Sequence, residues 1–303
     1  MSRLRADLCL LLTAMIWGTA FIAQKIANAT MGPISFVGAR FLLSAIMVIP
    51  LALFEARKAT VALSQRDIAI AVVIGLGLLI GSILQQTALI TTSATNGGFL
   101  TALYVVLVPV ATWILTRERI RGFVALACVI SVTGAWLLTY TGEQHTWESG
   151  DILLIVSDFA WAFAISLIAM FLQCAPRPYF LACTQFTITG VLALTAGLLL
   201  EPGTADGWRT ALPAILYAGL ISGGVAFTLQ IVAQRHTPAP EAALIMSLES
   251  VFAAIAGAVL LAERPTPLAM LGCVLILGGV VTAEMGPAVL ARFRSDRDQS
   301  RAR

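Results

Sequence analysis

The sequence predicts an all-α membrane protein of ten transmembrane helices, arranged as two inverted five-helix repeats. Only 12% of the 303 residues are charged, 59% are hydrophobic and the mean hydropathy is +0.91, whereas soluble domains carry roughly a quarter charged residues. Apolar segments long enough to cross a bilayer core as helices recur along the chain. The pattern of the first half returns about 145 residues later in the second half. Soluble globular classes are therefore excluded.

Ten apolar segments are the expected spans. Those of the first half cover approximately 7–29, 33–55, 67–90, 94–115 and 121–140. Those of the second half cover approximately 150–173, 178–200, 210–234, 239–261 and 266–286. We accordingly place the first repeat at 1–141, the second at 149–287, and a basic tail at 288–303. Pro50 and Pro109 lie inside apolar runs, where a proline is expected to kink the helix.

Matching residues in matching order identify the two halves as repeats. Moving back 145 positions places Glu118-Arg119 under Glu263-Arg264, Leu84-Gln85 under Leu229-Gln230, and Tyr104 opposite Glu249. The first span also has the basic start and apolar run of a cleavable signal peptide. However, Asp7 and Trp17 recur at the same spacing as Asp151 and Trp161 in the second half, which favours a retained helix.

Basic residues near the ends of the spans predict the orientation. With both termini in the cytoplasm, 15 Lys and Arg residues lie on the inner side and three on the outer side, which are Lys25, Arg209 and Arg264. We therefore expect a multi-pass protein of the cytoplasmic (inner) membrane with cytoplasmic N- and C-termini. Five spans per repeat is an odd number, so the second repeat enters the membrane from the opposite side. Inverted repeats place a substrate site near the midplane and supply two halves that can rock around it, as in a carrier.

Several other classes are excluded by what the sequence lacks. The net charge of +3 is too small to indicate a nucleic-acid partner. No HExxH, GxSxG or Walker A motif occurs, so the sequence indicates neither an enzyme nor direct use of ATP. The five cysteines show no metal-ligand spacing and are expected to pack as small apolar residues, without a disulfide framework. We expect no cofactor and no metal.

Local motifs resemble those of a known carrier family. The stretch 88–94 (ALITTSA), followed by 107–109 (LVP) and Glu118-Arg119, resembles an EamA-type carrier of the drug/metabolite transporter superfamily. A second copy is similar, with 233–238 (AQRHTP), 247–252 (SLESVF) and 262–264 (AER), and Trp17-Gly18 is similar to the family's opening. The chain departs from the pattern at Ala162, where glycine is expected after Trp161.

The resemblance covers roughly 7–286 and implies a fold and a broad activity. It implies ten helices, of which the fifth and tenth are peripheral. It also implies a central cavity lined by the first, third, fourth, sixth, eighth and ninth spans. Family members move amino acids, other metabolites or drugs, many of them outward.

Two acids and two bases are the charged candidates inside the predicted spans. Glu249 and Asp158 are the deepest acids, at positions where a charge is costly and normally faces a bundle interior or a wet cavity. Each could exchange a proton or contact a substrate ammonium, and a structural pair between helices is the alternative. Arg40 and Lys25 could hold a substrate carboxylate or balance the acids. Snorkelling to the interface is the alternative for both bases.

Aromatic and amide side chains complete the candidate site. Trp17 and Trp161 stand mid-span, away from the interfaces where tryptophan usually lies, so they either stack on substrate or pack between helices. Tyr104 and Phe99 could extend this aromatic wall. Neutral hydrogen bonds are offered by Gln85, Gln86, Asn96, Thr101 and Gln230. Bonding between helices is the alternative for these amides.

The favoured hypothesis is a secondary active transporter that exports small organic metabolites, with amino acids first, including apolar and aromatic ones. Few fixed charges, several amides and two tryptophans suit a zwitterion with an apolar side chain. Protons are a candidate coupling ion. The alternatives are a drug or organic-cation exporter with Glu249 and Asp158 as counter-charges and, from another class, a membrane sensor or channel. The substrate, the direction of transport in vivo and the oligomeric state are not indicated by the sequence.

Overall fold

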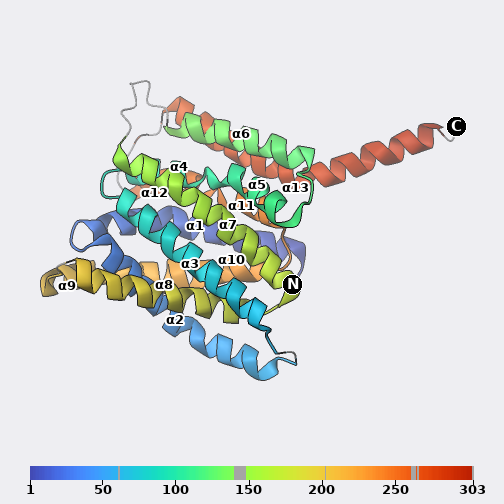
Figure 1. Ribbon diagram of the computed structural model, residues 1–303. Coiled ribbons are helices and arrows are strands. Elements are labelled where there is room, and N and C mark those ends of the chain that lie inside the picture. Colours follow the sequence, from blue (N-terminus) through green and yellow to red (C-terminus); the bar gives the residue numbers. More distant parts are fainter. Residues whose placement is uncertain (61, 140–147, 202, 261–263, 265, 302–303) are drawn as a thin grey trace.

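Every regular element of the described chain is a helix in the computed structural model (Figure 1). The structure describes residues 1–303 except 61, 140–147, 202, 261–263, 265 and 302–303. The first half comprises α1 (Arg3–Asn28), α2 (Pro33–Lys58), α3 (Gln65–Ala88), α4 (Ala94–Thr101), α5 (Tyr104–Thr116) and α6 (Gly122–Thr139). The second comprises α7 (Ser149–Cys174), α8 (Pro178–Leu200), α9 (Ala205–Leu216), the π-helix η1 (Tyr217–Phe227), α10 (Thr228–Ala233), α11 (Ala239–Met246), α12 (Glu249–Leu260) and α13 (Pro267–Arg301).

The predicted ten spans are confirmed. Eight stretches of the described chain are long and apolar enough to cross a membrane, and two shorter apolar helices cover Gly122–Leu138 and Pro267–Ala283. These two belong to α6 and α13, which pack against each other along one side of the bundle (Figure 1). The backbones of Gly134 and Gly272 meet there, since a Cβ atom on either glycine would collide with the other's carbonyl oxygen. This peripheral pair agrees with the implied outer position of the fifth and tenth spans.

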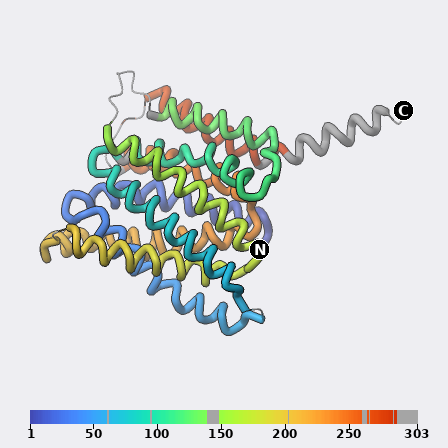
Figure 2. Tube along the Cα trace, viewed as in Figure 1, coloured from blue at the N-terminus to red at the C-terminus, as the bar shows by residue number. Residues whose placement is uncertain are grey.

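The chain runs back and forth along one bundle axis (Figure 2). We call the end at which α1 begins the N-terminal face, and the end at which α1 finishes the opposite face. Because each repeat has five spans, α1 starts at the N-terminal face and its equivalent α7 starts at the opposite face. Equivalent helices therefore run antiparallel, as predicted for inverted repeats.

Helices α2 and α8, the second spans of the two repeats, pack along each other and cap each other. At the start of α2, the backbone N–H groups of Ile34 and Ser35 donate to Glu201 at 3.0 and 2.8 Å. At the start of α8, the N–H groups of Tyr179 and Phe180 donate to Glu55 at 3.2 and 2.8 Å. A carboxylate at a helix N-terminus satisfies orphan donors and opposes the positive end of the dipole. The two halves are thus joined at both faces.

The prediction of continuous helices at 94–115 and 239–261 is wrong in one respect, because both spans are interrupted in the structure. The first is interrupted between α4 and α5 and the second between α11 and α12. Each break is one tight turn with i→i−3 bonds, from Leu103 N to Leu100 O at 3.1 Å and from Leu248 N to Ile245 O at 3.2 Å. The breaks fall 145 residues apart, so they occupy equivalent places in the repeats. Tyr104 and Glu249 begin the second half-helix after each break.

The eighth span is helical, but its central part, η1, is wound as a π-helix over Tyr217–Phe227. Backbone carbonyls in this segment accept bonds from side chains of other helices, which favours the wider winding. The Ser44 hydroxyl donates to Gly219 O at 2.7 Å, the Thr13 hydroxyl donates to Ala226 O at 3.1 Å, and the Trp17 indole N–H donates to Ser222 O at 3.3 Å. A π-helical segment inside a longer helix frequently marks a functional site.

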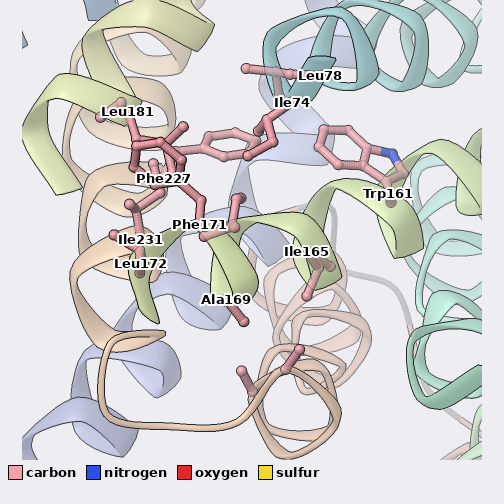
Figure 3. Close-up of a cluster of buried hydrophobic side chains, with 14 of the residues drawn as sticks. Ile74, Leu78, Trp161, Ile165, Ala169, Phe171, Leu172, Leu181, Phe227 and Ile231 are labelled. Carbon is pink, nitrogen blue, oxygen red and sulfur yellow. The ribbon is translucent and has the colours of Figure 1, made fainter. Parts of the chain in front are cut away.

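The largest buried apolar cluster joins both halves beside η1 (Figure 3). Leu78 comes from α3, Trp161 from α7, Leu181 from α8 and Phe227 from η1. Several members of this cluster also line the central cavity, which are Tyr104, Trp161, Ile165 and Phe227.

Candidate functional site

A cavity of about 40 Å³ lies inside the bundle and is lined by residues of both repeats. Its walls come from α1, α2, α3, α4, α5, α7, η1, α10 and α12. These elements belong to the six spans that the family resemblance implies, with the second span in addition. The lining includes eight of the residues singled out from the sequence, which are Trp17, Arg40, Gln85, Thr101, Tyr104, Trp161, Gln230 and Glu249.

Glu249 and Tyr104 are placed in this cavity by the two helix breaks. Each opens a half-helix, and each is only 2% exposed. The Tyr104 hydroxyl is close enough to the Glu249 carboxyl, and to that of Asp158 on α7, to interact electrostatically with both. Asp158 is 1% exposed and lies behind the lining residues. The structure therefore groups both deep acids around one phenol.

The two acids have no basic partner within the described residues. No ion pair there reaches Glu249 or Asp158, and neither carboxylate oxygen of Asp158 has a hydrogen-bonding partner. The Oε1 atom of Glu249 is likewise unpartnered. A buried carboxylate is costly as an anion unless a cation or a proton compensates it. This group can therefore accept a substrate cation or a proton.

Arg40 brings one cation to the cavity wall from α2. Its side chain is 3% exposed, so the guanidinium does not snorkel to a membrane surface. The Cζ atom lies 4.7 Å from the ring centroid of Phe41 and 5.7 Å from that of Phe36, in cation–π contact. In the part of the chain that the structure describes, Nε of Arg40 has no hydrogen-bonding partner. A planar carboxylate is the natural acceptor for such a group.

Lys25 does not join the acids as a charge partner. Its ammonium donates to the backbone carbonyls of Leu89, Ile90 and Thr92 at 2.8, 3.2 and 2.8 Å. It therefore holds the end of α3 and the loop that follows. The sequence did not reveal this role, because carbonyls at a helix end carry no residue signature.

Asn96 and Phe99 lie outside the cavity lining as well. The Asn96 N–H donates to the hydroxyl of Ser93, the N-cap of α4, at 3.1 Å. Phe99 packs against two other apolar clusters. Both residues belong to the first half-helix of the broken fourth span, and the break aims only its end, at Thr101, into the cavity.

The aromatic wall is built around Phe227, which sequence reasoning missed. Its ring centroid lies 4.5 Å from that of Trp17 and 5.9 Å from that of Trp161. Gly81 on α3 lets the Trp161 indole approach its backbone, because a Cβ atom there would sit 3.1 Å from the ring. No signal distinguishes Phe227 from the other apolar residues of its span. The remaining lining residues that the sequence did not indicate are Ala20, Phe21, Gln24, Ile165 and Ser222.

The amides divide between the two expected roles. Gln85 donates to the Thr101 hydroxyl at 3.1 Å, which links two helices. Gln86 lies outside the lining and donates to Gln24 O and to Asn28 Oδ1 at 3.0 and 2.8 Å. Gln230 donates to Gln234 at 3.2 Å, and its Oε1 atom has no partner in the described structure. Gln230 therefore offers the cavity a free acceptor.

One family model matches each half of the chain separately. The EamA-like transporter family matches residues 4–140 and again residues 148–284, so both halves carry the same domain. The chain belongs to the EamA-like transporter family. It is a multi-pass integral membrane protein of a transporter family, whose partners are the bilayer and a small-molecule substrate, and the family is not one of enzymes.

Similar proteins occur in an archaeon, a bacterium and a plant. An uncharacterized transporter of Archaeoglobus fulgidus is 30% identical over 288 residues, which cover 93% of this chain and 87% of that protein. The threonine/homoserine exporter RhtA of Escherichia coli K12 is 26% identical over 189 residues, which cover 62% of this chain and 61% of RhtA. A WAT1-related protein of Arabidopsis thaliana is 24% identical over 304 residues, which cover 89% of this chain and 81% of that protein.

A solved crystal structure shares the fold. It superposes with a TM-score of 0.74 at 18% sequence identity, and the match covers 95% of this chain and 99% of the other. At this identity the match shows the fold alone.

Proposed function

We propose that this EamA-family protein is a secondary active transporter that exports small zwitterionic metabolites, amino acids first, by alternating access around the central cavity. One observation carries the proposal. The same cavity exposes a guanidinium, Arg40, and a carboxyl group, Glu249, and neither has an ionic partner within the described residues. An amino acid presents both complementary charges, so it would compensate both groups at once.

The aromatic wall supports an apolar substituent on the substrate. Trp17, Trp161 and Phe227 offer ring faces beside the charged groups, and such faces accept aliphatic or aromatic side chains. Gln85, Gln230 and Thr101 supply neutral hydrogen bonds that suit a small polar side chain. The similarity to RhtA, a threonine/homoserine exporter, is consistent with substrates of this size.

Glu249, with Asp158, is the proposed site of proton coupling. The pair lacks a cation among the described residues, so a bound proton would compensate a carboxylate when the cavity holds no substrate. A substrate ammonium would compete with the proton at Glu249. A pH gradient would then drive transport, because substrate and proton occupy one group alternately.

A drug or organic-cation exporter is the second candidate, and the two acids beside an aromatic wall favour it. We expect the membrane to be the cytoplasmic membrane, with both chain termini in the cytoplasm, as the distribution of Lys and Arg indicates.

The test is counterflow of labelled compounds in proteoliposomes containing the full chain. We expect neutral amino acids to accumulate transiently against excess unlabelled substrate, which a channel cannot support. Accumulation of organic cations without amino acids would overturn the proposed substrate class. Flux without trans-stimulation would overturn the carrier mechanism.

A further inference from the structure

A polar contact joins the two halves at the opposite face of the bundle. Thr92 lies in the loop between α3 and α4 of the first half, and Asp151 lies in the first turn of α7 in the second half. The Thr92 hydroxyl donates to Asp151 Oδ1 at 2.8 Å, and the two residues are 1% and 0% exposed. Beside it, the Gly150 N–H donates to the Thr91 hydroxyl at 3.1 Å. We call the Thr92–Asp151 contact the Asp151 clasp.

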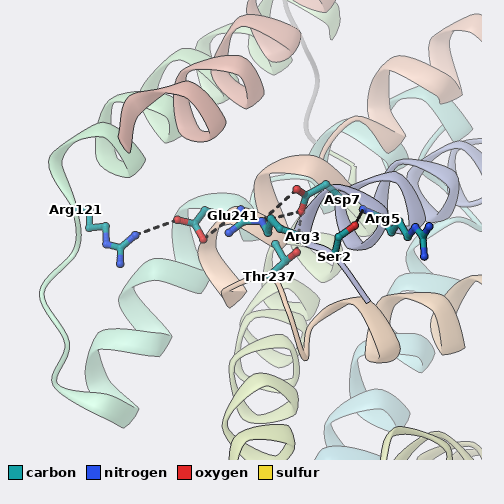
Figure 4. A network of polar contacts seen from close by, with 7 residues as sticks. All are labelled: Ser2, Arg3, Arg5, Asp7, Arg121, Thr237 and Glu241. Atoms are coloured by element: carbon teal, nitrogen blue, oxygen red, sulfur yellow. Dashed lines mark hydrogen bonds and ion pairs between the residues drawn. The ribbon is translucent and has the colours of Figure 1, made fainter. Parts of the chain in front are cut away.

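The same contact recurs at the N-terminal face with the halves exchanged. Thr237, between α10 and α11 of the second half, donates through its hydroxyl to Asp7 Oδ1 on α1 at 2.8 Å. Thr237 is the repeat equivalent of Thr92, 145 residues on, and Asp151 is that of Asp7, 144 residues on. Figure 4 shows Asp7 and Thr237 facing each other next to Arg3 and Glu241. We call this contact the Asp7 clasp.

The central cavity lies between the two clasps along the bundle. Asp7 begins the span that carries Trp17, and Asp151 begins the span that carries Trp161. Both tryptophans line the cavity. Opening either clasp would therefore move the tryptophan on that span relative to the other half of the bundle. In a carrier built from inverted repeats, the two faces open in turn as one repeat rocks against the other, so equivalent contacts at the two faces fit this motion.

We infer that the Asp7 and Asp151 clasps are the two gates of the carrier, each closing the cavity toward one side of the membrane. This inference rests on the alternating access of the proposed function. In the structure both clasps are closed. A surface hollow reaches Thr237 and Glu241 beside the Asp7 clasp, and the side chain of Asp7 is 17% exposed whereas Asp151 is 0% exposed. The Asp7 clasp is thus the more solvent-accessible of the two.

The surroundings of the clasps differ in charge. At the N-terminal face, Arg3 lies 3.1 Å from Asp7 and 3.7 Å from Glu241, and Arg121 lies 3.5 Å from Glu241. At the opposite face, Lys25 holds the carbonyl of Thr92 at 2.8 Å, which fixes the loop that carries the hydroxyl. The hydroxyl–carboxylate contact is the element common to both faces.

Asp151 also caps its own helix, so the test must act on the threonines. Its second oxygen, Oδ2, accepts the Glu148 N–H at 3.1 Å, and replacing Asp151 would disturb the start of α7. Thr92→Val and Thr237→Val remove each hydroxyl at nearly constant shape. Thr92→Ser and Thr237→Ser keep the hydroxyl and should behave as the parent protein. Thr133→Val is the matched control, because the bond that the Thr133 hydroxyl makes to the described residues lies within its own helix, to Val129 O at 2.8 Å.

The measurement is sided labelling of a cavity cysteine in the full chain. Ile165→Cys, in the cavity lining, is introduced after the five native cysteines are replaced. A membrane-impermeant thiol reagent is then added to either side of proteoliposomes. Losing a hydrogen bond to a charged group shifts a two-state equilibrium by about tenfold. We expect Thr92→Val to raise labelling by about this factor from the opposite face alone, and Thr237→Val from the N-terminal face alone.

The gate assignment would be contradicted if both valine variants label to the same extent as Thr133→Val. It would also be contradicted if either variant increases labelling from both sides of the membrane at once. A second measurement covers variants that fold poorly. In the protein without native cysteines, disulfides formed in Thr92→Cys/Asp151→Cys and in Asp7→Cys/Thr237→Cys should each stop exchange. Reduction should restore exchange, which shows that the closed disulfide, and not the lost Asp151 cap, caused the block. Exchange at full rate with either clasp covalently closed would overturn the inference. Labelling needs no substrate, so a sided response without amino-acid counterflow would refute the proposed substrate and leave the gates standing.

Discussion

Tyr104 and Glu249 occupy equivalent positions in the two repeats and meet in the same buried cavity. Each begins the half-helix that follows the break in the fourth span of its repeat. The backbone of the site is therefore symmetric, while its chemistry is not, because one repeat supplies a hydroxyl and the other supplies a carboxyl. Discontinuous helices at the repeat interface commonly form the binding sites of transporters. This relationship makes Glu249 the centre of the proposed mechanism.

Arg40 should determine the preference for zwitterions. In Arg40→Gln, we expect the affinity for amino acids to fall about tenfold or more, because a hydrogen bond to a charged group contributes roughly 1.5–3 kcal/mol. The affinity for any organic cation that binds should fall little. Both affinities are measured by competition of unlabelled compounds with labelled amino-acid counterflow. Arg209→Gln is the control, because that side chain is 83% exposed. Equal loss for amino acids and cations would remove Arg40 from the carboxylate site.

The tryptophans of the cavity should affect transport more than folding. We expect Trp17→Ala and Trp161→Ala each to lower the transport rate per folded protein by about tenfold, since a stacking or cation–π contact contributes roughly 1–2 kcal/mol. Trp136→Ala is the control, because Trp136 is 54% exposed on the peripheral helix α6. Counterflow and size-exclusion chromatography are compared for each variant. A loss of transport that only parallels the loss of folded protein would assign both rings to packing.

The reciprocal caps should support stability and not selectivity. Glu55→Gln and Glu201→Gln each remove the negative charge and one of the two oxygens that accept from backbone N–H groups of the partner helix. We expect a loss of about 0.5–2 kcal/mol for each, seen as a lower Tm in detergent. Transport per folded protein should not change. Glu118→Gln, at an exposed position, is the control. An unchanged Tm in both cap variants would show that the caps contribute nothing to stability.

The orientation in the membrane is open to a direct test. Cysteines at Arg57 and Asp206, which lie at exposed positions of the N-terminal and opposite faces, should label from different sides of the membrane. Arg57→Cys should label from the cytoplasm, because Lys and Arg gather at its face. Labelling of both cysteines from one side would contradict the inverted arrangement. Labelling with the sides exchanged would reverse the predicted orientation.

The sequence predicted the spans well because the bilayer limits the choices. Backbone groups in lipid must bond internally, so an apolar run of sufficient length can only be a helix. The same constraint singled out Trp17, Arg40, Tyr104 and Glu249, since a polar or amphipathic side chain inside a span is costly in lipid and therefore tends to face the protein interior. The structure brings these residues together in one cavity. Their binding role remains a prediction.

The breaks and the π-helix could not be predicted from local sequence. The turns at Ala102-Leu103 and Ser247-Leu248 contain no glycine or proline, so nothing there ends a helix on intrinsic grounds. Tertiary packing around Tyr104 and Glu249 decides their position. Phe227 was missed for a related reason, because a phenylalanine in an apolar span looks the same whether it faces lipid, core or cavity. Lys25 was assigned by depth alone, and depth does not reveal carbonyl partners.

The most direct test of the account is Glu249→Gln, which keeps the shape of the side chain and removes its titration. Purified protein in proteoliposomes is compared with the parent protein for exchange of a neutral amino acid and for accumulation driven by a pH gradient. If substrate and proton compete for Glu249, exchange should survive with weaker affinity, and accumulation driven by the pH gradient should disappear. Exchange and pH-driven accumulation both at the parent rates, in folded Glu249→Gln protein, would contradict the account.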